Sequence, residues 1–202
     1  MFLIALLPLF LCVAVAIKWN DGGPVFYRGE RVGRGGRLFR IFKFRSMVVH
    51  AEAMGGCSTS GNDARLTRVG AFIRRYKIDE LPQLINVLKG EMSLVGPRPE
   101  VSRYVALYSE EEQLILTVRP GITDWASIWN ADEGSFLAGT IDPEKAYEEL
   151  IRPTKLALQL FYVRNHSLWI DVRILFCTLF RLARVHWLPH ELRSCKPLKA
   201  AK

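Results

Sequence analysis

The sequence predicts a mostly α-helical domain with a small β-hairpin, an α+β fold that associates with a membrane. An apolar run from Phe2 to Ile17 is followed at once by basic residues. Two short runs rich in aromatic residues flank a glycine-rich turn at Gly33–Gly36, which is typical of a hairpin. Apolar residues then recur at helical spacing through most of the chain, and 202 residues suffice for one domain with a core.

The composition excludes several classes of protein. Half of the residues are hydrophobic and 24% are charged, so the chain is neither disordered nor a multi-span membrane protein. The formal net charge of +8 predicts an anionic partner, which is nucleic acid, an acidic membrane surface or a phosphorylated substrate. No zinc site is expected, because Pro189 interrupts the helix that would align His186 with His190. The cysteines lack zinc spacing and are predicted to be reduced: Cys12, Cys57, Cys177 and Cys195.

The apolar run from Phe2 to Ile17 has three interpretations. A straight helix of this length would reach about 24 Å, short of the roughly 30 Å hydrocarbon core, and Pro8 favours a kink. A secretory signal peptide, a short spanning helix and a bent re-entrant helix therefore compete. The basic residues from Lys18 to Arg37 predict that this side of the membrane is cytoplasmic, which disfavours export. Physical reasoning leaves the re-entrant and spanning helices open.

Strands are expected at Val25–Tyr27 and Leu38–Phe44, in a strongly basic part of the sequence. The basic residues over Arg28–Arg40 belong either to a solvated hairpin or to a surface for lipid headgroups or substrate phosphates. The two interpretations are balanced for that stretch. Lys43 and Arg45 lie among bulky apolar residues, which favours a phosphate-binding role for both.

The best-marked helix is predicted at Asp79–Gly90. Its apolar residues recur one helical turn apart from Leu81 to Leu88, Pro82 suits the first turn, and Gly90 suits the end. Further helices are expected at Leu66–Tyr76, Glu100–Val118 and Asp142–Asn165. Residues 48–64 are predicted to form a helix end followed by a mobile loop, and residues 123–140 an irregular segment.

A second membrane-facing helix is predicted at Ser167–Val185. Arg173, Arg181 and Arg184 share one sector of about 80° on a helical wheel, and most other positions are apolar. This pattern is typical of an interfacial amphipathic helix, with an ordinary core-packing helix as the alternative. Asp171 lies on the apolar side and therefore needs a partner or a function.

Asp79 and Glu80 are the candidate catalytic residues. Acids in a first helical turn commonly act only as caps. Here a basic stretch, Arg74–Lys77, precedes them, and Arg98 follows between two prolines as a second candidate for phosphate binding. We expect the cations to keep Asp79 ionised, as a nucleophile or a metal ligand. Motifs of competing chemistries, such as a Walker loop or a G-x-S-x-G elbow, are absent.

Several segments carry motifs in one order along the chain: Lys43–Met47, Lys77–Glu100, Arg119–Thr123 and Ser167–Asp171. Together they closely resemble the bacterial sugar transferase family, the monotopic polyprenyl-phosphate phosphoglycosyl transferases. The resemblance extends from Pro8 to about Thr178. It implies a membrane re-entrant helix at 1–18, a phosphoglycosyl transferase catalytic domain at 19–190 and a basic tail at 191–202.

The resemblance also implies a reaction. Such enzymes move a sugar 1-phosphate from a UDP-sugar to undecaprenyl phosphate at the cytoplasmic face of the inner membrane, giving undecaprenyl-diphosphate-sugar and UMP and starting a glycan. The aspartate matching Asp79 attacks the sugar-proximal phosphate and forms a covalent phosphosugar intermediate. Mg²⁺ is required, with Asp79 and Glu80 as the expected metal contacts. Substrate binding is assigned to Lys43, Arg45, Arg98 and Arg119, with Asp171 as a supporting polar residue.

Two features depart from the family pattern. Relatives usually carry a longer N-terminal half-helix before the proline that matches Pro8, so either the start is misplaced or truncated, or the membrane arm is short. Asp124 occupies a position where many relatives have glycine. Together with a longer insert at 130–150, Asp124 is expected to mark a distinct subgroup and to lie near the determinants of sugar specificity.

Two other functional classes are weaker. A membrane-bound scaffold without catalysis is disfavoured by the intact Asp79–Glu80 pair. A nucleic-acid binder is suggested by charge alone, since the sequence lacks an interleaved aromatic platform. The expected partners are therefore a UDP-sugar, undecaprenyl phosphate and membrane lipid, and no nucleic acid. A homodimer is left open.

Overall fold

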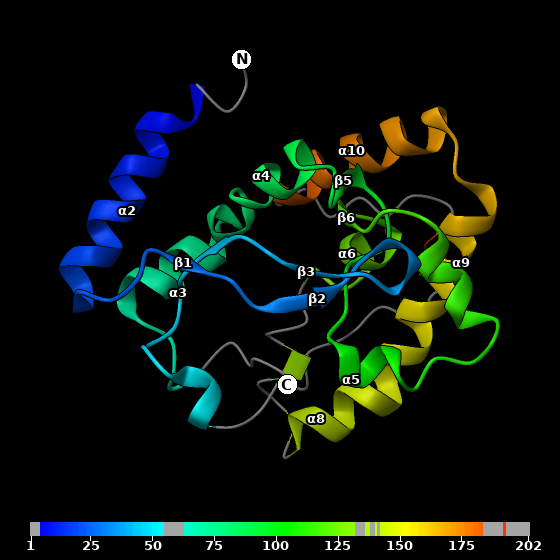
Figure 1. Cartoon of the computed structure of the whole chain (residues 1–202), viewed down its shortest axis with the longest axis horizontal. Helices are drawn as coiled ribbons and strands as arrows, with labels where there is room; N and C mark the ends of the chain where they lie inside the picture. The colour runs from blue at the N-terminus through cyan, green and yellow to red at the C-terminus, as the bar shows by residue number, and fades with distance from the viewer. Residues whose placement is uncertain are drawn as a thin grey trace.

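The computed structural model describes residues 5–54, 63–131, 136–137, 140, 142–183 and 192. This part of the chain is mostly helical and contains three pairs of short strands. Figure 1 shows a long N-terminal helix at one edge of the molecule, with shorter helices gathered around the strands. The predicted combination of many helices with a small hairpin is confirmed, and membrane association stays a prediction.

The N-terminal helix, α2, spans Leu7–Asp21. Pro8 lies in its first turn, where its missing N–H leaves no hydrogen bond unmade. Ala5, before the turn at Leu6, is helical as well, and the kink expected at Pro8 stays a prediction. Gly22, at φ 71°, ends the helix in the left-handed conformation that glycine adopts readily.

One side of α2 packs on the body of the protein, and the other is open. Val13 and Ile17 are buried against Phe44 and Ile73. Trp19, by contrast, is 87% exposed. Among the residues that the structure describes, no helix is both long enough and apolar enough to cross a membrane.

The predicted hairpin is present but contains an additional strand. The single strand expected over Leu38–Phe44 is interrupted, because the Phe42 N–H donates to the Asn86 side chain at 2.8 Å instead of to a neighbouring strand. The pairs are antiparallel: β1 (Phe26–Tyr27) with β4 (Lys43–Phe44), and β2 (Glu30–Val32) with β3 (Leu38–Arg40) around the 3₁₀ turn η1 (Arg34–Gly36).

Helix α3 (Arg68–Arg75) confirms the helix predicted at Leu66–Tyr76. Thr67 caps it by accepting the Gly70 N–H at 2.9 Å. A Cβ atom at Gly70 would lie 1.8 Å from the carbonyl oxygen of Ser46, so only glycine allows this close packing. In the segment predicted to be a helix end followed by a loop, the structure has a short 3₁₀ helix, η2 (Ala51–Met54).

Asp79 and Glu80 lie in a separate turn, which corrects the helix predicted at Asp79–Gly90. The turn is a 3₁₀ helix, η3 (Ile78–Glu80), and α4 (Gln83–Leu88) follows it. Because Pro82 has no N–H to donate to Ile78, Leu81 closes the turn on that carbonyl at 3.1 Å. Gly90, at φ 74°, follows the end of α4 as predicted.

Two strands that were not predicted form a parallel pair, β5 (Ser93–Val95) with β6 (Gly121–Thr123). The connection between them contains α5 (Ser102–Val105) and the 3₁₀ helix η4 (Glu112–Thr117), in place of one helix at Glu100–Val118. Ser109 and Glu112 exchange side chain–backbone hydrogen bonds of 2.8 and 3.3 Å in a capping box, which starts a new helix at that point.

Helix α6 (Trp125–Trp129) follows β6 in a segment predicted to be irregular. The helical prediction for Asp142–Asn165 is confirmed, and the described helix of the second membrane candidate is α10 (Leu168–Leu182). The 142–165 segment contains α8 (Pro143–Ala146), the π-helix η5 (Tyr147–Ile151) and α9 (Arg152–Asn165). Pro153 lacks the N–H that would continue the α-helical hydrogen-bond pattern next to η5.

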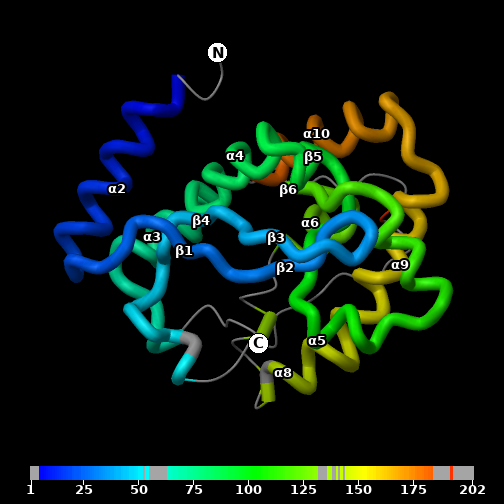
Figure 2. The backbone as a smooth tube through the Cα atoms, viewed as in Figure 1, coloured from blue at the N-terminus to red at the C-terminus, as the bar shows by residue number. Residues whose placement is uncertain are grey.

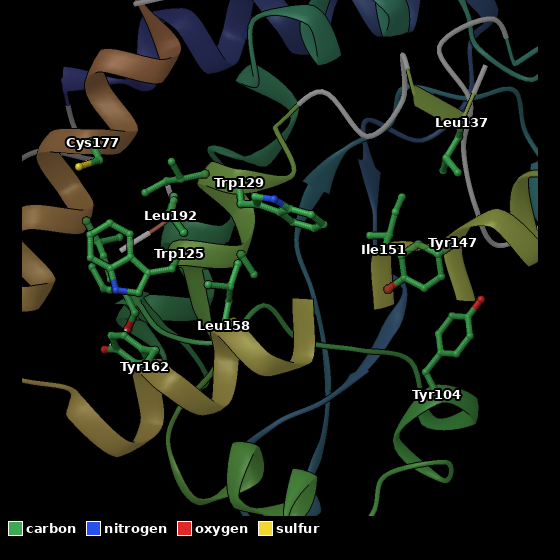
Figure 3. Packing of buried hydrophobic residues seen from close by; sticks show 14 residues of the cluster. Tyr104, Trp125, Trp129, Leu137, Tyr147, Ile151, Leu158, Tyr162, Cys177 and Leu192 are labelled. Carbon is green, nitrogen blue, oxygen red and sulfur yellow. Dashed lines mark hydrogen bonds between the residues drawn. The ribbon is translucent and has the colours of Figure 1, made fainter. Parts of the chain in front are cut away.

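The main hydrophobic core lies among α6, α9 and α10. Figure 3 shows Trp125 and Trp129 from α6 packed near Leu158 of α9, and the cluster also includes Ile151 and Ile174. The backbone tube in Figure 2 places β5 and β6 between α10 and the hairpin, and both strands contact α10. The core therefore supports the loops that follow β5 and precede β6.

Some predictions lie outside the described residues. They concern the loop 55–62, Arg184, Cys57, Cys195 and the tail 191–202 apart from Leu192. Among the described cysteines, Cys12 and Cys177 are free, as predicted.

Candidate active site

Asp79 and Glu80 follow a residue with unusual backbone geometry. Lys77 has φ 56°, which a non-glycine residue adopts when the surrounding structure holds it there. Neither acid acts as a side-chain cap: α4 follows Pro82, and no side-chain cap hydrogen bond is present at either η3 or α4. The Asp79 side chain is buried, and its Oδ1 atom has no hydrogen-bond partner in the described structure.

Glu80 is the anion of a compact ion cluster. Lys43 of β4 donates to Glu80 Oε1 at 2.9 Å. Arg98 donates to both carboxylate oxygens, with 3.0 Å between Nη1 and Oε2. This two-bond arrangement is among the stronger pairings of arginine with carboxylate. The turn η3, strand β4 and the loop after β5 are thereby joined at one point.

The two adjacent carboxyl groups have opposite pKa shifts. Burial and the neighbouring Glu80 charge raise the pKa of Asp79, against the opposing effect of Lys43 and other nearby cations. Burial also acts to raise the pKa of Glu80, but Arg98 and Lys43 outweigh it and hold that pKa well below its usual range. The cations thus favour the carboxylate form of Asp79, as expected, but burial and Glu80 outweigh them in the direction of the pKa shift. Such divergent carboxyl pairs are typical of sites in which each group has its own role.

Arg98 stands on a loop that is packed tightly against the start of β6. A Cβ atom at Gly96 would lie 2.6 Å from the Arg119 carbonyl oxygen, and one at Gly121 would lie 2.1 Å from the Gly96 nitrogen. Gly121 N–H also donates to the Pro97 carbonyl at 2.9 Å. Glycine permits this approach because it has no Cβ. The structure thus brings the loops of Arg98 and Arg119 together, with the Arg119 side chain exposed.

Arg45 lies at a different place from the Glu80 cluster. Its buried guanidinium donates to the Asp21 carboxylate and to the carbonyls of Pro24 and Met47. Arg45 therefore fastens the end of α2 to the strand region, and these bonds occupy most of its N–H donors. Phosphate binding by Arg45 stays a prediction.

Asp171 has the partner that its place on α10 requires. It accepts a 2.8 Å hydrogen bond from the hydroxyl of Tyr162 on α9. The contact joins α9 to the start of α10. A substrate-binding role for Asp171 stays a prediction.

Two buried polar residues beside Arg98 are missing from the predicted site. Asp124 accepts the Arg98 N–H at 3.4 Å and a Gln159 side-chain N–H at 3.3 Å. Gln159 also donates to the Arg98 carbonyl at 3.4 Å. Asp124 had a sequence signal, since it departs from the family pattern. Gln159 had a weaker one, as a polar side chain between Leu158 and Leu160 of a helix.

A second buried ion pair follows the same loop. Lys155 of α9 pairs with Glu100, which comes directly after Pro99, and also donates to the Tyr147 hydroxyl at 2.9 Å. Burial lowers the pKa of Lys155, but Glu100 and Tyr147 outweigh this effect and raise it above its ordinary value. Helix α9 therefore contacts the loop that carries Arg98 at two points, through Gln159 and through Lys155.

The carboxylates of the site fit a metal ion only in part. Within the described ranges, no group of three or more His, Cys, Asp or Glu residues is arranged to hold one. Asp79 offers the unpartnered Oδ1, whereas both Glu80 oxygens already accept from Lys43 and Arg98. Mg²⁺ is commonly held by one or two carboxylates together with substrate phosphates and water. The residues therefore fit a Mg²⁺ ion that is bound together with a phosphate-bearing substrate.

Comparison with known proteins decides the family. The sequence profile described as bacterial sugar transferase matches residues 1–185. This chain belongs to that family. The resemblance carried by the four motifs is thus confirmed over nearly the whole sequence.

Individual members of the family are similar to this chain. The UDP-N-acetylgalactosamine-undecaprenyl-phosphate N-acetylgalactosaminephosphotransferase of Aeromonas hydrophila is 42% identical over 85% of this chain and 38% of its own length. The undecaprenyl-phosphate glucose phosphotransferase of Komagataeibacter xylinus is 42% identical over 90% of this chain and 33% of its own length. The exopolysaccharide production protein ExoY of Sinorhizobium fredii is 36% identical over 88% of this chain and 78% of its own length. The chain thus spans about a third of the length of the first two sugar transferases.

Proposed function

We propose that this sugar transferase moves a sugar 1-phosphate from a UDP-sugar to undecaprenyl phosphate, giving undecaprenyl-diphosphate-sugar and UMP and beginning the assembly of a glycan. The observation that carries the proposal is the geometry of Asp79 and Glu80. Asp79 is buried with one unpartnered oxygen, and Glu80 beside it is held between Lys43 and Arg98. The names of the similar proteins support this class of donor and acceptor.

The chemistry takes two displacements at one phosphorus atom. First, a carboxylate oxygen of Asp79 attacks the sugar-bearing phosphorus of the donor, the bond to the bridging oxygen breaks, and UMP leaves with the electron pair. Second, a phosphate oxygen of undecaprenyl phosphate attacks the same phosphorus and releases Asp79 as a free carboxylate. Both steps bring anions together, so fixed cations at the site lower the barrier.

The remaining residues bind and hold the substrates. We assign Arg98 and Lys43 to the donor phosphates, with Glu80 fixing the position of both cations before substrate arrives. Arg119, on the adjacent loop, is assigned to the second phosphate. Mg²⁺ held by Asp79 would supply further positive charge at the phosphates. Arg45 and Asp171 then act indirectly, by seating α2 and α10.

Membrane lipid is proposed as the surface on which the reaction occurs. Helix α10 buries Ile174 and Cys177 but exposes a row of large apolar side chains that includes Trp169 and Phe176. A core-packing helix would bury such side chains. The exposed side of α2 is apolar as well, and basic residues follow it in sequence. We propose that both helices lie in the cytoplasmic face of the inner membrane, with α2 as a re-entrant segment.

The full chain in detergent or nanodiscs tests the reaction directly. UMP release is measured with undecaprenyl phosphate, Mg²⁺ and a panel of UDP-sugars that includes N-acetylgalactosamine, glucose and galactose donors. In the absence of lipid phosphate, intact-protein mass spectrometry is expected to detect one sugar phosphate added to the chain. The Asp79→Asn variant is expected to show neither the adduct nor turnover.

Several outcomes would contradict the proposal. Full turnover by Asp79→Asn would exclude a covalent intermediate on Asp79. Lipid binding without UMP release from any donor would favour the non-catalytic scaffold instead. Vesicle flotation tests whether the protein binds a membrane. We expect the double variant Trp169→Glu with Phe176→Glu to lose this binding. Light scattering of the same preparation tests the homodimer.

A further inference from the structure

The main chain of Arg98 is held by two buried side chains, one from the residue that caps α6 and one from α9. Its N–H donates to Asp124 Oδ2 at 3.4 Å, and its carbonyl accepts from Gln159 Nε2 at 3.4 Å. Gln159 Nε2 also donates to Asp124 Oδ2 at 3.3 Å, which closes a ring of three contacts. Both side chains are 0% exposed. The ring lies on the opposite end of Arg98 from its contact with Glu80.

This ring holds the main chain of Arg98 itself, whereas the 2.9 Å bonds from Gly121 N–H to the Pro97 carbonyl and from Val32 N–H to the Glu100 carbonyl hold the loop on either side. Pro97 and Pro99 have no N–H, so Arg98 carries the only backbone donor in the stretch from Pro97 to Pro99. That donor points to Asp124 rather than to a strand. The guanidinium end of the same residue reaches Glu80. The direction of the side chain therefore depends on how firmly its peptide is held.

Burying Asp124 requires compensation, which the surrounding N–H groups supply. A buried carboxylate is costly unless its oxygens accept hydrogen bonds. One oxygen, Oδ1, accepts the Ser127 N–H at 2.7 Å and caps α6. The other, Oδ2, serves the Arg98 peptide and Gln159. Capping explains only one of the two carboxylate oxygens, Oδ1, and a serine or threonine would suffice as a cap.

We propose that Asp124 and Gln159 are positioning residues, which orient Arg98 so that its guanidinium is set for the donor phosphate before substrate binds. The proposal rests on the proposed function for its consequence in catalysis, but the anchoring itself is independent of it. Effective catalysis depends on such preorganisation, since a misplacement of about 1 Å can cost on the order of 100-fold in rate.

Two substitutions separate the anchor from the cap. Asp124→Asn keeps the size of the side chain and one carbonyl oxygen to cap α6, but it replaces the Oδ2 acceptor with a donor. Gln159→Leu keeps a similar volume and removes both donated bonds. Thr178→Val is the matched control, because it removes the 2.7 Å hydrogen bond between Thr178 and Thr123 without touching the Arg98 loop.

Hydrogen exchange of the Arg98 amide tests the anchor without any activity. Arg98 supplies the only exchangeable backbone amide between Pro97 and Pro99, so a signal resolved to that stretch reports on one hydrogen bond. We expect exchange at least about 10-fold faster in Asp124→Asn and Gln159→Leu than in the wild type or Thr178→Val. Unchanged protection of the Arg98 amide in Asp124→Asn or in Gln159→Leu overturns the proposal, even if activity falls.

A double-mutant cycle tests whether the pair acts through the Arg98 side chain. Gln159→Leu is expected to lower kcat/KM for the UDP-sugar by about 10-fold or more in the wild-type background. In an Arg98→Ala background it should have little further effect, because the group that it positions is gone. Equal losses in both backgrounds would assign Gln159 a purely structural role. If the wild type releases no UMP, the proposed function fails while the exchange result still stands.

Discussion

Arg98 and Glu80 are joined by two hydrogen bonds across 18 positions of sequence, one to each carboxylate oxygen. The contact fixes the loop after β5 to the turn that presents Asp79. Lys43 completes the cluster from β4 at 2.9 Å. Three segments that are separate in sequence thus converge on one carboxylate, and the neighbouring Asp79 is left with an unpartnered oxygen.

Replacement of Glu80 by glutamine is expected to lower UMP release by about 100-fold or more, because a neutral amide no longer holds Lys43 and Arg98 in position. Breaking this partly buried pair should also lower the melting temperature. Thermal unfolding and steady-state kinetics measure the two effects. Glu149→Gln, which alters an exposed pair with Lys145, is the control and should change neither. Full activity of Glu80→Gln would remove Glu80 from the site.

The Asp79→Asn variant is expected to be more stable than the wild type at neutral pH. Because the pKa of Asp79 is raised above its ordinary value of 3.8, its contribution to stability is fully present below that value and lost as pH rises through the folded pKa. The ionised, buried carboxylate therefore destabilises the fold at pH 7. Each kcal/mol relieved corresponds to about 2–4 °C in Tm for a chain of this size.

The measurement for Asp79→Asn is a series of thermal melts between pH 3 and pH 8, values chosen to bracket the ordinary carboxyl range of roughly 4. The gain in Tm should vanish at the acid end. A variant that melts below the wild type at neutral pH would show that Asp79 stabilises the fold as an anion. Glu80 should behave in the opposite way, since its depressed pKa gives stability above its ordinary value of 4.5 that is lost as pH falls through the folded pKa.

Replacement of Lys77 by glycine is expected to move the acid limb of the pH–rate profile upward. Lys77 helps to lower the pKa of Asp79, and glycine keeps the φ of 56° while removing the charge. Because Lys77 is exposed, the shift should be small and should shrink in high salt. Lys77→Ala, which removes the charge but strains the backbone, serves as the comparison. A limb that stays in place at low salt would contradict this account.

The pair of Asp21 and Arg45 is expected to hold α2 onto the catalytic body. Asp21→Asn and Arg45→Met should each lower Tm by about 4–8 °C, which corresponds to roughly 2 kcal/mol. The double variant should lose little more, since the two side chains act as one unit. Limited proteolysis after Lys18 should become faster in all three. Additive losses would indicate that Arg45 has a separate role, as its predicted phosphate binding requires.

Replacement of Gly70 by alanine should destabilise the protein by about 1–3 kcal/mol, because the new Cβ would lie 1.8 Å from the Ser46 carbonyl oxygen, which is backbone and cannot swing away. Chemical denaturation measures the loss. Ala71→Ser, at the exposed neighbouring position, is the control and should be nearly neutral. A Gly70→Ala variant with wild-type stability would mean that α3 sits further from Ser46 than described.

Much of the helical content was predictable, and the errors have identifiable causes. Helix α3 and the helix of Ser167–Val185 were found because their apolar spacing is regular. The helix at Glu100–Val118 was wrong because the capping box of Ser109 and Glu112 went unrecognised. The parallel strands β5 and β6 were missed, since three-residue strands are too short to show alternation.

The sequence by itself determined the family and singled out Asp79, Glu80, Lys43 and Arg98 as candidates, because short motifs keep their chemistry wherever the chain places them. Only the tertiary structure decided that Arg98 and Lys43 share Glu80, that Arg45 belongs to Asp21, and that Asp124 and Gln159 hold the Arg98 peptide. It also showed that burial and Glu80 outweigh the effect of the cations on the pKa of Asp79. The reason is that contacts and burial join residues far apart in the chain, and the strength of a charge depends on the water that packing removes.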